Sequence, residues 1–358
     1  MKWRKVLKVI LIVLLAVLIV VGGYVAYVFL SYHRIADNQP LEIRGGADGA
    51  LSAGQPHTIV TWNLGFGAYS DDYTFFMDGG KESWARSADA VRENIGGAVD
   101  RLKELDPDLM LLEEVDFNST RSYHIDQREL IYPAFEGLSS TWAQNYDSPF
   151  LCYPLTQPHG ASKSCIMTFA KAGITSAVRR SLPIETSVYK VLDLDRCYSV
   201  SRIPTDDGRE LCLYCLHLSA YTSDGTIATD QLIMLLSDMK AEYDAGNYVI
   251  AGGDFNKDLL GNSPEIFGVS GDAYTWAQPI DLSLIPEGLT LQAALDPDDP
   301  VPSCRNCDIP YVKGETFVVT VDGFITSDNI SVEEVHVEDE GFRVTDHNPV
   351  VMTFTLGA

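Results

Sequence analysis

The chain has few basic residues relative to acidic ones. Its 358 residues include 26 Lys and Arg against 50 Asp and Glu, a formal net charge of −24. Residues 1–56 hold six of these basic and three of these acidic residues, so residues 57–358 hold 20 and 47, a balance of −27. Such a surface repels polyanions at long range, and a nucleic-acid enzyme usually carries a basic footprint. The charge therefore disfavours a long nucleic acid as substrate without excluding one, since a local basic patch and metal ions can overcome the field.

The chain also lacks a disorder signature, an internal repeat and a second linker. Hydrophobic residues make up 46% and charged residues 21% of the sequence, which is ordinary globular composition. Residues 31–56 are polar, hold several Gly and Ala and show no apolar period, so they are expected to form a linker. Residues 57–358 are expected to form one domain, which we expect to be a monomer.

No small-residue cleavage site ends the N-terminal apolar run. Residues 1–8 hold four cationic residues, and Val9–Leu30 follows without a charge. A helix of that length spans roughly 30 Å and can cross the hydrocarbon core of a bilayer, whereas a cleaved signal peptide has a shorter apolar region. We therefore expect a single-pass signal anchor in the cell membrane, with residues 1–8 cytoplasmic and the body extracytoplasmic. The alternative, a buried core helix, is disfavoured because no polar face interrupts the run.

The seven cysteines lack the spacing of a zinc site. Their odd number leaves at least one thiol unpaired outside the membrane. Cys212 and Cys215 lie in a predicted strand, where they are expected to be small buried hydrophobic residues. Cys304 and Cys307 form a C-x-x-C in a predicted loop, with no second such pair and no His pair. A local disulfide or two free thiols is therefore favoured over a zinc site.

Strand and helix patterns alternate along the body. Apolar residues at three- and four-residue steps predict helices from Trp84 to Leu102 and from Leu232 to Tyr243, and the first is expected to end at Asp106-Pro107. Region 258–310 is rich in Pro, Asp and Gly and is expected to be mostly loop with short helices. Apolar and β-branched runs predict strands at Thr58–Asn63, Asp108–Glu114, Ile166–Phe169, Val188–Val200, Glu210–Leu218, Tyr248–Gly252, Thr316–Ile325, Ser331–Val337 and Val350–Thr355. Many short strands with two helices predict an α/β fold of two packed sheets flanked by helices.

Polar residues stand at the ends of the predicted strands. An apolar run precedes each of Asn63, Glu114, His217, Asp254 with Asn256, and Asp322. Strand ends gathered on one edge of a sheet would bring these side chains around one cleft, whereas a buried core would reject unpaired carboxylates. Several carboxylates at one edge require a cation, and oxygen ligands suit Mg²⁺, Mn²⁺ or Ca²⁺.

This pattern resembles the endonuclease/exonuclease/phosphatase superfamily, the deoxyribonuclease I-like fold, in a membrane-anchored bacterial form. The matching motifs come in the family's order over most of residues 57–358: Trp62-Asn63, Leu111-Leu112-Glu113-Glu114-Val115, His217-Leu218, Gly252-Gly253-Asp254-Phe255-Asn256, Val321-Asp322-Gly323-Phe324-Ile325 and Asp346-His347-Asn348-Pro349. Any one motif is weak. Two of them, GDFN and DHNPV, in this order and each after a predicted apolar strand, are together quite specific. The resemblance implies a four-layer α/β sandwich of two mixed sheets.

The resemblance also implies a role for each matching residue. Glu114 matches the principal metal ligand, with Asn63 beside it and Asp346 as a second metal or water contact. Asp254 matches the carboxylate that orients or deprotonates the attacking water. The phosphate contacts are implied for Asn256 and His217. His347 matches the histidine that contacts or protonates the phosphoryl oxygen, and Asp322 matches the carboxylate that fixes its tautomer. These groups suit in-line attack on a phosphoester, because a cation, histidines and amides stabilise the negative charge that develops.

Two departures from the family pattern leave roles open. Many relatives have Gln-Glu where this chain has Glu113-Glu114, so Glu113 either binds a second ion or points away. Relatives often carry Asn-Thr where Cys215-Leu216 precedes His217, which puts one contact near the phosphate in doubt. Two arginines, Arg121 and Arg305, are candidate substrate-binding residues because Arg forks suit phosphates. Surface salt bridges are the alternative for both.

Two functions from different classes follow. The first is a Mg²⁺- or Mn²⁺-dependent hydrolase of phosphoesters, held at the membrane by its N-terminal helix. The second is a catalytically inactive extracytoplasmic binding domain that retains the fold, which the intact set of site residues argues against. The anchor favours lipid or inositol phosphoesters, and extracellular nucleic acid is the other candidate substrate. The family's substrates include all these types, so fold alone does not choose among them.

Overall fold

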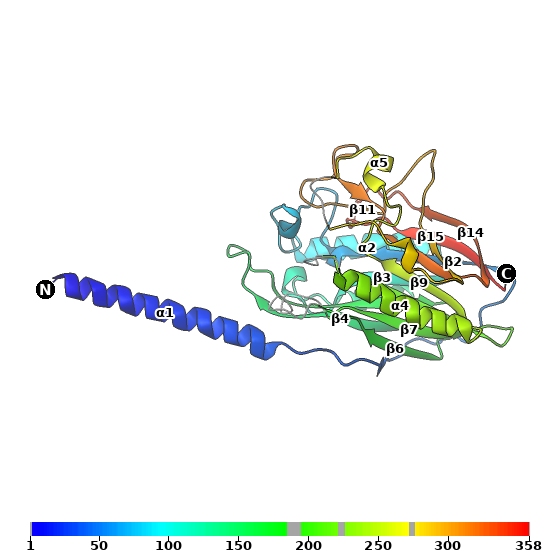
Figure 1. Cartoon of the computed structure of the whole chain (residues 1–358), viewed down its shortest axis with the longest axis horizontal. Helices are drawn as coiled ribbons and strands as arrows, with labels where there is room; N and C mark the ends of the chain where they lie inside the picture. Colours follow the sequence, from blue (N-terminus) through cyan, green and yellow to red (C-terminus); the bar gives the residue numbers. More distant parts are fainter. Residues whose placement is uncertain (1, 185–194, 221–225, 272–275, 358) are drawn as a thin grey trace.

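The computed structural model describes residues 2–184, 195–220, 226–271 and 276–357. Figure 1 shows two β-sheets packed face to face with a long helix on each outer side, and a further helix, α1 (Lys2–Ser31), that extends away from this body. The predicted α/β fold of two mixed sheets flanked by helices is confirmed.

One sheet has six strands. Its two central strands, β2 (Pro56–Asn63) and β3 (Leu109–Asp116), run parallel, and all its other neighbours are antiparallel. Both strands are rich in apolar and β-branched residues and are almost wholly buried beyond their first residues, as expected for strands covered on both faces. In spatial order the sheet is β14 (Ile330–Val337), β15 (Val350–Leu356), β2, β3, β5 (Gly160–Ala170) and β4 (Ser139–Leu151).

The other sheet has seven strands, and again one central pair is parallel. This pair is β8 (Glu210–His217) and β9 (Tyr248–Asp254), joined by the helix α4 (Thr226–Asp244). A parallel pair needs such a crossover connection. In spatial order the sheet is β1 (Gln39–Pro40), β6 (Ser176–Ser181), β7 (Cys197–Pro204), β8, β9, β13 (Asp322–Ser327) and β10 (Leu289–Gln292).

Three apolar layers hold the sandwich together. The central layer lies between the sheets and includes Ile59 and Leu111 from one sheet and Leu213 and Ile250 from the other. Helix α2 (Ala88–Leu105) covers the six-stranded sheet through an apolar face, and α4 covers the seven-stranded sheet in the same way. The order helix, sheet, sheet, helix is the predicted four-layer arrangement.

Local residues explain where α2 begins and ends. The Ser87 side chain accepts a hydrogen bond from the Ala90 amide at 3.0 Å and caps the N-terminus. Asp106 adopts a left-handed conformation with φ 43° after the last turn, and Pro107 follows. The helix therefore ends where the sequence predicts.

Short elements complete the fold. They lie in the connections between the sheets' strands and at the strand ends. These are α3 (Arg128–Ile131), α5 (Ser263–Phe267), the two-stranded ribbon of β11 (Cys304–Arg305) and β12 (Val318–Val319), and 3₁₀ turns at Gly65–Gly67, Phe76–Asp78, Thr120–Ser122, Tyr132–Ala134 and Leu282–Leu284.

Some predicted strands differ from the observed ones. The predicted strand Thr316–Ile325 is two strands, β12 and β13, separated by a break before Asp322. The prediction Val188–Val200 falls largely outside the described residues, and the strand found there, β7, begins at Cys197. The sequence did not predict β4 or β6, and region 258–310 contains β10 as well as loop.

The predicted linker is attached to the folded body. Strand β1 pairs with β6, Arg44 bridges to Ser140, and Leu51 is buried in the central apolar layer. These contacts fix the path of residues 39–51 along the domain, so the segment is not a free tether. The apolar residues of this segment show no regular period, because it contacts the domain only at single residues that are separated by polar turns.

Helix α1 is long and apolar enough to cross a membrane. By length and composition it qualifies, with a mean hydropathy of 3.1 over its most apolar window, and none of that window is buried against the body. The same test is passed by signal sequences, but a core helix of a soluble protein would be covered by the domain, and α1 is not.

Candidate active site

Five of the predicted site residues come from strand ends at one edge of the sandwich. Asn63 ends β2, His217 ends β8 and Asp254 ends β9, while Glu114 lies near the end of β3. The break before β13 corrects one detail: Asp322 begins its strand and does not end one. Because β13 is antiparallel to β9 and pairs Asp322 with Asp254, both carboxylates still lie at the same edge.

A bulge in β3 separates the two neighbouring glutamates. The register of β3 against β5 shifts between Leu112 and Val115, and Glu114 has φ 52°, a left-handed conformation that ordinary residues rarely adopt. Its side chain is 25% exposed and accepts no hydrogen bond from a described residue. Glu113 is fully buried and accepts a hydrogen bond from Thr61 Oγ1 at 3.1 Å. The bulge therefore turns Glu114 toward the site opening and Glu113 into the interior.

Burial governs the charge state of Glu113. The pKa of its carboxyl lies well above its usual range, first because it is fully buried and then because Asp322 and Asp254 repel a negative charge. A protonated Glu113 carries no charge, and a Gln side chain, which is also neutral, would suit the same buried position. Its position favours the second of the two readings left open by the sequence, a side chain that points away from the cleft.

Asp254 lies at the centre of the site. Its Oδ1 accepts a hydrogen bond from the Asn256 amide at 2.8 Å, and its Oδ2 accepts one from Asn63 Nδ2 at 3.1 Å. Gly253 before it has φ 146°, and a Cβ at that glycine would lie 2.0 Å from the Leu216 carbonyl oxygen. Only glycine fits this approach of β9 to β8, and the approach positions the Asp254 carboxylate beside His217.

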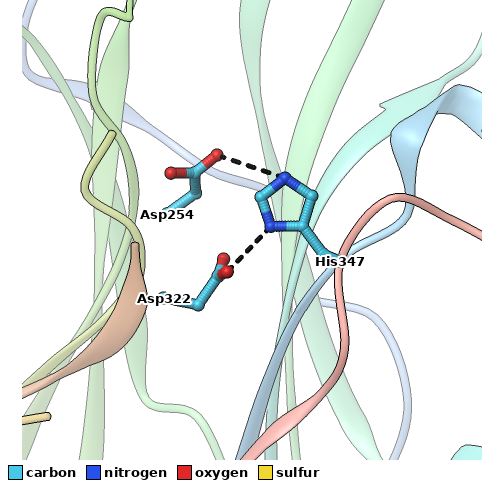
Figure 2. Close-up of side chains that lie close together, drawn as sticks. All are labelled: Asp254, Asp322 and His347. Atoms are coloured by element: carbon cyan, nitrogen blue, oxygen red, sulfur yellow. Dashed lines mark hydrogen bonds and ion pairs between the residues drawn. The ribbon is translucent and has the colours of Figure 1, made fainter. Parts of the chain in front are cut away.

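His347 faces Asp254 and Asp322 from the opposite sheet. Figure 2 shows one ring nitrogen directed at each carboxylate. Nδ1 lies 2.8 Å from Asp322 Oδ2, a hydrogen bond, and Nε2 lies 3.9 Å from Asp254 Oδ2. Asp322 Oδ2 also accepts a hydrogen bond from Ser303 Oγ at 2.7 Å. Asp322 therefore fixes the orientation of the imidazole, as the sequence predicts for this pair.

The environments of the two central groups have opposite effects on their charge. Burial, followed by repulsion from Asp322, raises the pKa of Asp254 to about 7. The pKa of His347 lies well above its usual range despite burial, which lowers it, because Asp322 attracts the imidazolium. Near neutral pH Asp254 is therefore partly ionised, and His347 carries protons on both ring nitrogens.

His217 and Asn63 flank Asp254. His217 Nε2 lies 3.4 Å from Asp254 Oδ2 and 4.0 Å from Glu114 Oε1. Its pKa lies well below the usual range because the ring is buried, with Arg196 as the next cause, so the ring is neutral. Asn63 Oδ1 accepts a hydrogen bond from the Gly65 amide at 3.0 Å, which orients its side chain.

Asn256 and Asp346 are held by local hydrogen bonds. Asn256 has φ 50° and donates a hydrogen bond from Nδ2 to the Leu218 carbonyl at 2.8 Å. Asp346 accepts a hydrogen bond from Thr345 Oγ1 at 3.2 Å and contacts Cys307 Sγ at 3.5 Å. Burial raises the pKa of Glu114, and the negative charge of Asp346 raises it further, while Arg121 opposes this rise.

The C-x-x-C residues contact the site without a disulfide. Cys304 Sγ lies 3.4 Å from His347 Nε2, and Cys307 contacts Asp346. All seven cysteines are free thiols, and Cys212 and Cys215 are buried as predicted. Of the two alternatives that the sequence left for Cys304 and Cys307, the structure has two free thiols.

The two predicted substrate-binding arginines are both buried. Arg121 forms a two-point ion pair with Asp116, at 3.0 and 2.9 Å, and its Nη2 lies 4.0 Å from Glu114 Oε2. Its guanidinium also lies 3.9 Å above the Phe66 ring. It therefore borders the site beside Glu114, and a surface salt bridge does not describe it.

The guanidinium of Arg305 is held by backbone carbonyls. The residue is 1% exposed, and its guanidinium donates to backbone carbonyls of Tyr69, Ser70, Tyr73, Asn306 and Ile309. These contacts hold the loop after β2 against the loop before β12. The structure thus uses this cation to fix two loops, and a substrate contact of Arg305 stays a prediction.

Sequence reasoning missed two residues that act on the site. Arg196 is buried, and its positive charge lies near three site residues. Burial raises the pKa of Glu114 and Asp254, and Arg196 opposes that rise, whereas it adds to the lowering of the pKa of His217 by burial. Ser303 holds Asp322 as described above. Arg196 precedes β7, and Ser303 lies in the proline-rich loop. Neither residue belongs to a recognisable motif, so the sequence carries no signal for them.

The donor set fits a divalent cation. Glu114 and Asp346 repel one another, and Glu114 lacks a hydrogen-bond donor of its own among the described residues. A cation between such oxygens relieves that repulsion, and an all-oxygen set with Asn63 suits Mg²⁺ or Mn²⁺. A tighter group of possible ligand atoms, from Asp254, Asp322 and His347, lies within 4.8 Å. A cation bound there would have to displace a proton from His347, whose pKa Asp322 raises.

The fold and the site together define the class of protein. Two mixed sheets with acidic, amide and histidine side chains at one edge form the arrangement of a hydrolytic α/β sandwich enzyme. The sequence model of the endonuclease/exonuclease/phosphatase family matches residues 60–347, and the chain belongs to this family. No curated protein matches the sequence significantly.

Solved structures with the same fold are distant in sequence. An endonuclease/exonuclease/phosphatase protein from Beutenbergia cavernae is 17% identical over 85% of this chain and 72% of its own, with a TM-score of 0.56. ANGEL2, described as a 2′,3′-cyclic phosphatase and bound to adenosine-2′,3′-vanadate, is 14% identical over 88% of this chain and 98% of its own, with a TM-score of 0.53. TDP2 from Caenorhabditis elegans is 12% identical over 85% and 75%, with a TM-score of 0.51. At these identities the likeness establishes the fold alone.

Proposed function

We propose that the chain is a membrane-anchored hydrolase of phosphoester bonds that depends on Mg²⁺ or Mn²⁺ and acts outside the cytoplasmic membrane. The observation that carries this proposal is the Asp254–His347–Asp322 arrangement, in which a partly ionised carboxylate faces a protonated imidazole. A base and an acid on opposite sides of one small space suit the attack of water on phosphorus.

Each residue has a task in this proposal. Asp254 orients and deprotonates the attacking water. His347, held by Asp322, donates from Nε2 to the phosphoryl oxygen, and neutral His217 donates a hydrogen bond to the phosphate. Asn256 contacts the same oxygens.

The metal completes this site. Glu114, Asn63 and Asp346 would hold the cation, which supplies charge neutralisation to the phosphoryl group when bound. Arg121 and Arg196 add positive charge to the surroundings of Glu114. This charge partly offsets the strongly acidic body near the place where a phosphate would bind.

Helix α1 supports the membrane part of the proposal. Four basic residues precede its apolar run, which favours a cytoplasmic N-terminus and an extracytoplasmic domain. Protease protection tests this orientation: in intact cells, an externally added protease should digest the domain, and protection of the domain would contradict the proposed side.

Substitution of Asp254 tests the catalytic part. Asp254→Asn keeps the shape and can still accept the hydrogen bond from the Asn256 amide, although it loses the acceptor for Asn63 Nδ2. It removes the base, so Mg²⁺-dependent hydrolysis of bis-p-nitrophenyl phosphate should fall by about 10²-fold or more. The melting temperature should stay near that of the wild type. EDTA should abolish wild-type activity, and Mg²⁺ or Mn²⁺ should restore it. If wild-type protein hydrolyses no phosphoester with either ion, the chain is instead an inactive binding domain.

The substrate is tested with a panel of DNA, RNA, sphingomyelin, inositol phosphates and the chromogenic diester. The acidic body predicts poor turnover of long nucleic acids at low salt, because repulsion is then strongest. DNA cleavage that is efficient at low salt and falls steeply as salt rises would instead identify a nuclease.

A further inference from the structure

The hairpin that joins β4 to β5 has an uncharged, apolar tip. Residues 148–162 contain no Asp, Glu, Lys or Arg, although the body around them has a balance of −27. Three of their large apolar side chains point into solvent: Phe150 is 40% exposed, Tyr153 69% and Leu155 85%. Asp147 and Lys163 pair at 3.4 Å where the charge-free stretch begins and ends. Exposed apolar side chains gathered at one tip indicate a surface that is covered in use.

The end of α1 contacts this hairpin directly. Tyr24 Oη accepts a hydrogen bond from the Cys152 amide at 3.0 Å and donates one to the Phe150 carbonyl at 3.2 Å. Tyr27 Oη accepts one from the Phe150 amide at 3.1 Å. Two tyrosines of the apolar helix thus satisfy three backbone groups of the hairpin. Backbone groups placed among lipids need such partners, because no water is present there to supply them.

The position of these contacts along α1 sets the depth of the hairpin. Tyr24 lies six residues before Leu30, the end of the charge-free run, which corresponds to about 9 Å along a helix. If the apolar run of α1 lies in the bilayer, the backbone around Phe150 and Cys152 lies at or just below the membrane surface. Tyrosines are enriched at that depth, where the ring is buried and the hydroxyl meets polar groups.

A short series of contacts connects the hairpin to the candidate active site. Tyr153 packs on Phe76 with ring centroids 5.8 Å apart, and Phe76 packs on His159 at 5.9 Å. At the base of the hairpin, Gly160 lies so close to Thr120 that a Cβ there would be 2.3 Å from the Thr120 side chain. The next residue, Arg121, lies 4.0 Å from Glu114. The hairpin, the end of α1 and the rim beside Glu114 are therefore one connected part of the molecule.

We propose that residues 148–162 insert their tip into the headgroup region of the bilayer that α1 spans, and that this contact presents the active site to phosphoester headgroups of lipids in the same membrane. The proposal rests on the function proposed above and names its substrate class. A zwitterionic membrane fits this surface, because the hairpin is uncharged and the surrounding acidic body would be repelled by anionic lipid.

Tryptophan fluorescence of the full chain in nanodiscs tests the insertion. Leu155→Trp places a reporter at the most exposed apolar position of the hairpin, and brominated phosphatidylcholine should quench the added emission relative to wild type. The matched control is Leu282→Trp, at a residue that is 61% exposed and precedes β10, the far edge strand of the other sheet. Its added emission should not be quenched. Equal quenching of both reporters, or of neither, would overturn the insertion.

Activity on two substrates tests the consequence. Tyr153→Ser with Leu155→Ser should lower hydrolysis of a lipid phosphodiester in zwitterionic nanodiscs by about ten-fold or more, because two apolar side chains lose their contact with lipid. Hydrolysis of soluble bis-p-nitrophenyl phosphate should stay within about two-fold. Leu282→Ser is the control and should leave both rates unchanged.

The outcomes separate this inference from the proposed function. Absence of wild-type activity on both substrates removes the proposed function and this inference with it. Wild-type activity on the soluble diester, with a lipid rate that the hairpin substitutions do not change, overturns only the inference. A change from dimer to monomer in the double variant without quenching of the Leu155→Trp reporter would show that a second copy covers the tip, and would also overturn it.

Discussion

At the residue scale, the charge states of Asp254 and His347 predict a pH dependence. A base must be ionised to accept a proton, and burial and Asp322 raise the pKa of Asp254 to about 7. Hydrolysis should therefore increase with pH through the range below about 7 and then level off. The pKa of His347 is raised well above its usual range, so the acid stays protonated and no decline is expected across neutral pH.

A profile of kcat/KM for a soluble diester between about pH 5 and 9 measures this effect at saturating metal. A bound cation lowers the pKa of a nearby carboxyl, so the midpoint should lie at or below 7. A rate that is highest at the acid end and falls as the pH rises would contradict the assignment of Asp254 as the base. Asp254→Asn, measured in the same way, provides the control.

Most of the central site residues could be predicted from the sequence, because polar groups at the ends of apolar strands are exceptional enough to be noticed. The family resemblance assigned the metal-ligand role to Glu114, but the sequence could not tell whether Glu113 also faces the cleft. That choice depends on one bulge in β3, which appears only when β3 pairs with β5. Arg121 and Arg305 were grouped together by their residue type, but their partners differ, and those partners come from distant segments.

At the scale of single elements, the end of β3 and the turn after it depend on a buried ion pair. Asp116 is fully buried, binds Arg121 at two points and accepts a hydrogen bond from Ser122 Oγ at 2.8 Å. Removing one member of a buried pair leaves the other uncompensated, at a cost of about 3–5 kcal/mol. Asp116→Ala should therefore lower the free energy of unfolding by that amount, and Arg121→Met should have a similar effect.

A double-mutant cycle checks this prediction by denaturant unfolding of both single variants and the double variant. Because neither partner remains in the double variant, its loss should be clearly smaller than the sum of the two single losses. Additive losses would show that the pair is not coupled. Arg92→Met is a suitable control, since its ion pair with Asp89 lies on the exposed surface of α2 and should be worth less than about 1 kcal/mol.

Elements were predictable where apolar residues dominate them. Strands β2, β3, β8 and β9 are continuous apolar runs, and α2 has a regular apolar face with end signals. Strand β4 was missed because three Ser and single Asn, Gln, Asp and Pro residues interrupt its strand-forming residues. Its extended form comes from pairing with β5 along ten positions, which local sequence does not reveal.

At the scale of the whole molecule, the segment between α1 and the domain contributes to the fold. A chain that begins at Tyr32 keeps β1 and Leu51, whereas one that begins at His57 loses both. Leu51 is 4% exposed, and removing a buried leucine costs about 2–5 kcal/mol. We expect the longer truncation to lower the melting temperature by several degrees relative to the shorter one.

Thermal unfolding of the two truncated chains measures the difference. In the shorter truncation, Leu51→Ala should reproduce much of the loss, which separates the effect of the buried side chain from that of chain length. Equal melting temperatures for all three proteins would show that residues 32–56 are a passive connection.

The attachment of residues 39–51 to the domain has a consequence for where the enzyme works. A flexible tether would let the catalytic domain sweep a hemisphere above its anchor and reach soluble molecules or neighbouring surfaces. Here the segment is fixed along β6 and in the core, and α1 is fixed to the hairpin, so the domain has little freedom to swing. For the membrane-lipid substrate that we propose, the search would become two-dimensional, and the rate should follow the mole fraction of substrate lipid in the plane of the membrane instead of the bulk concentration.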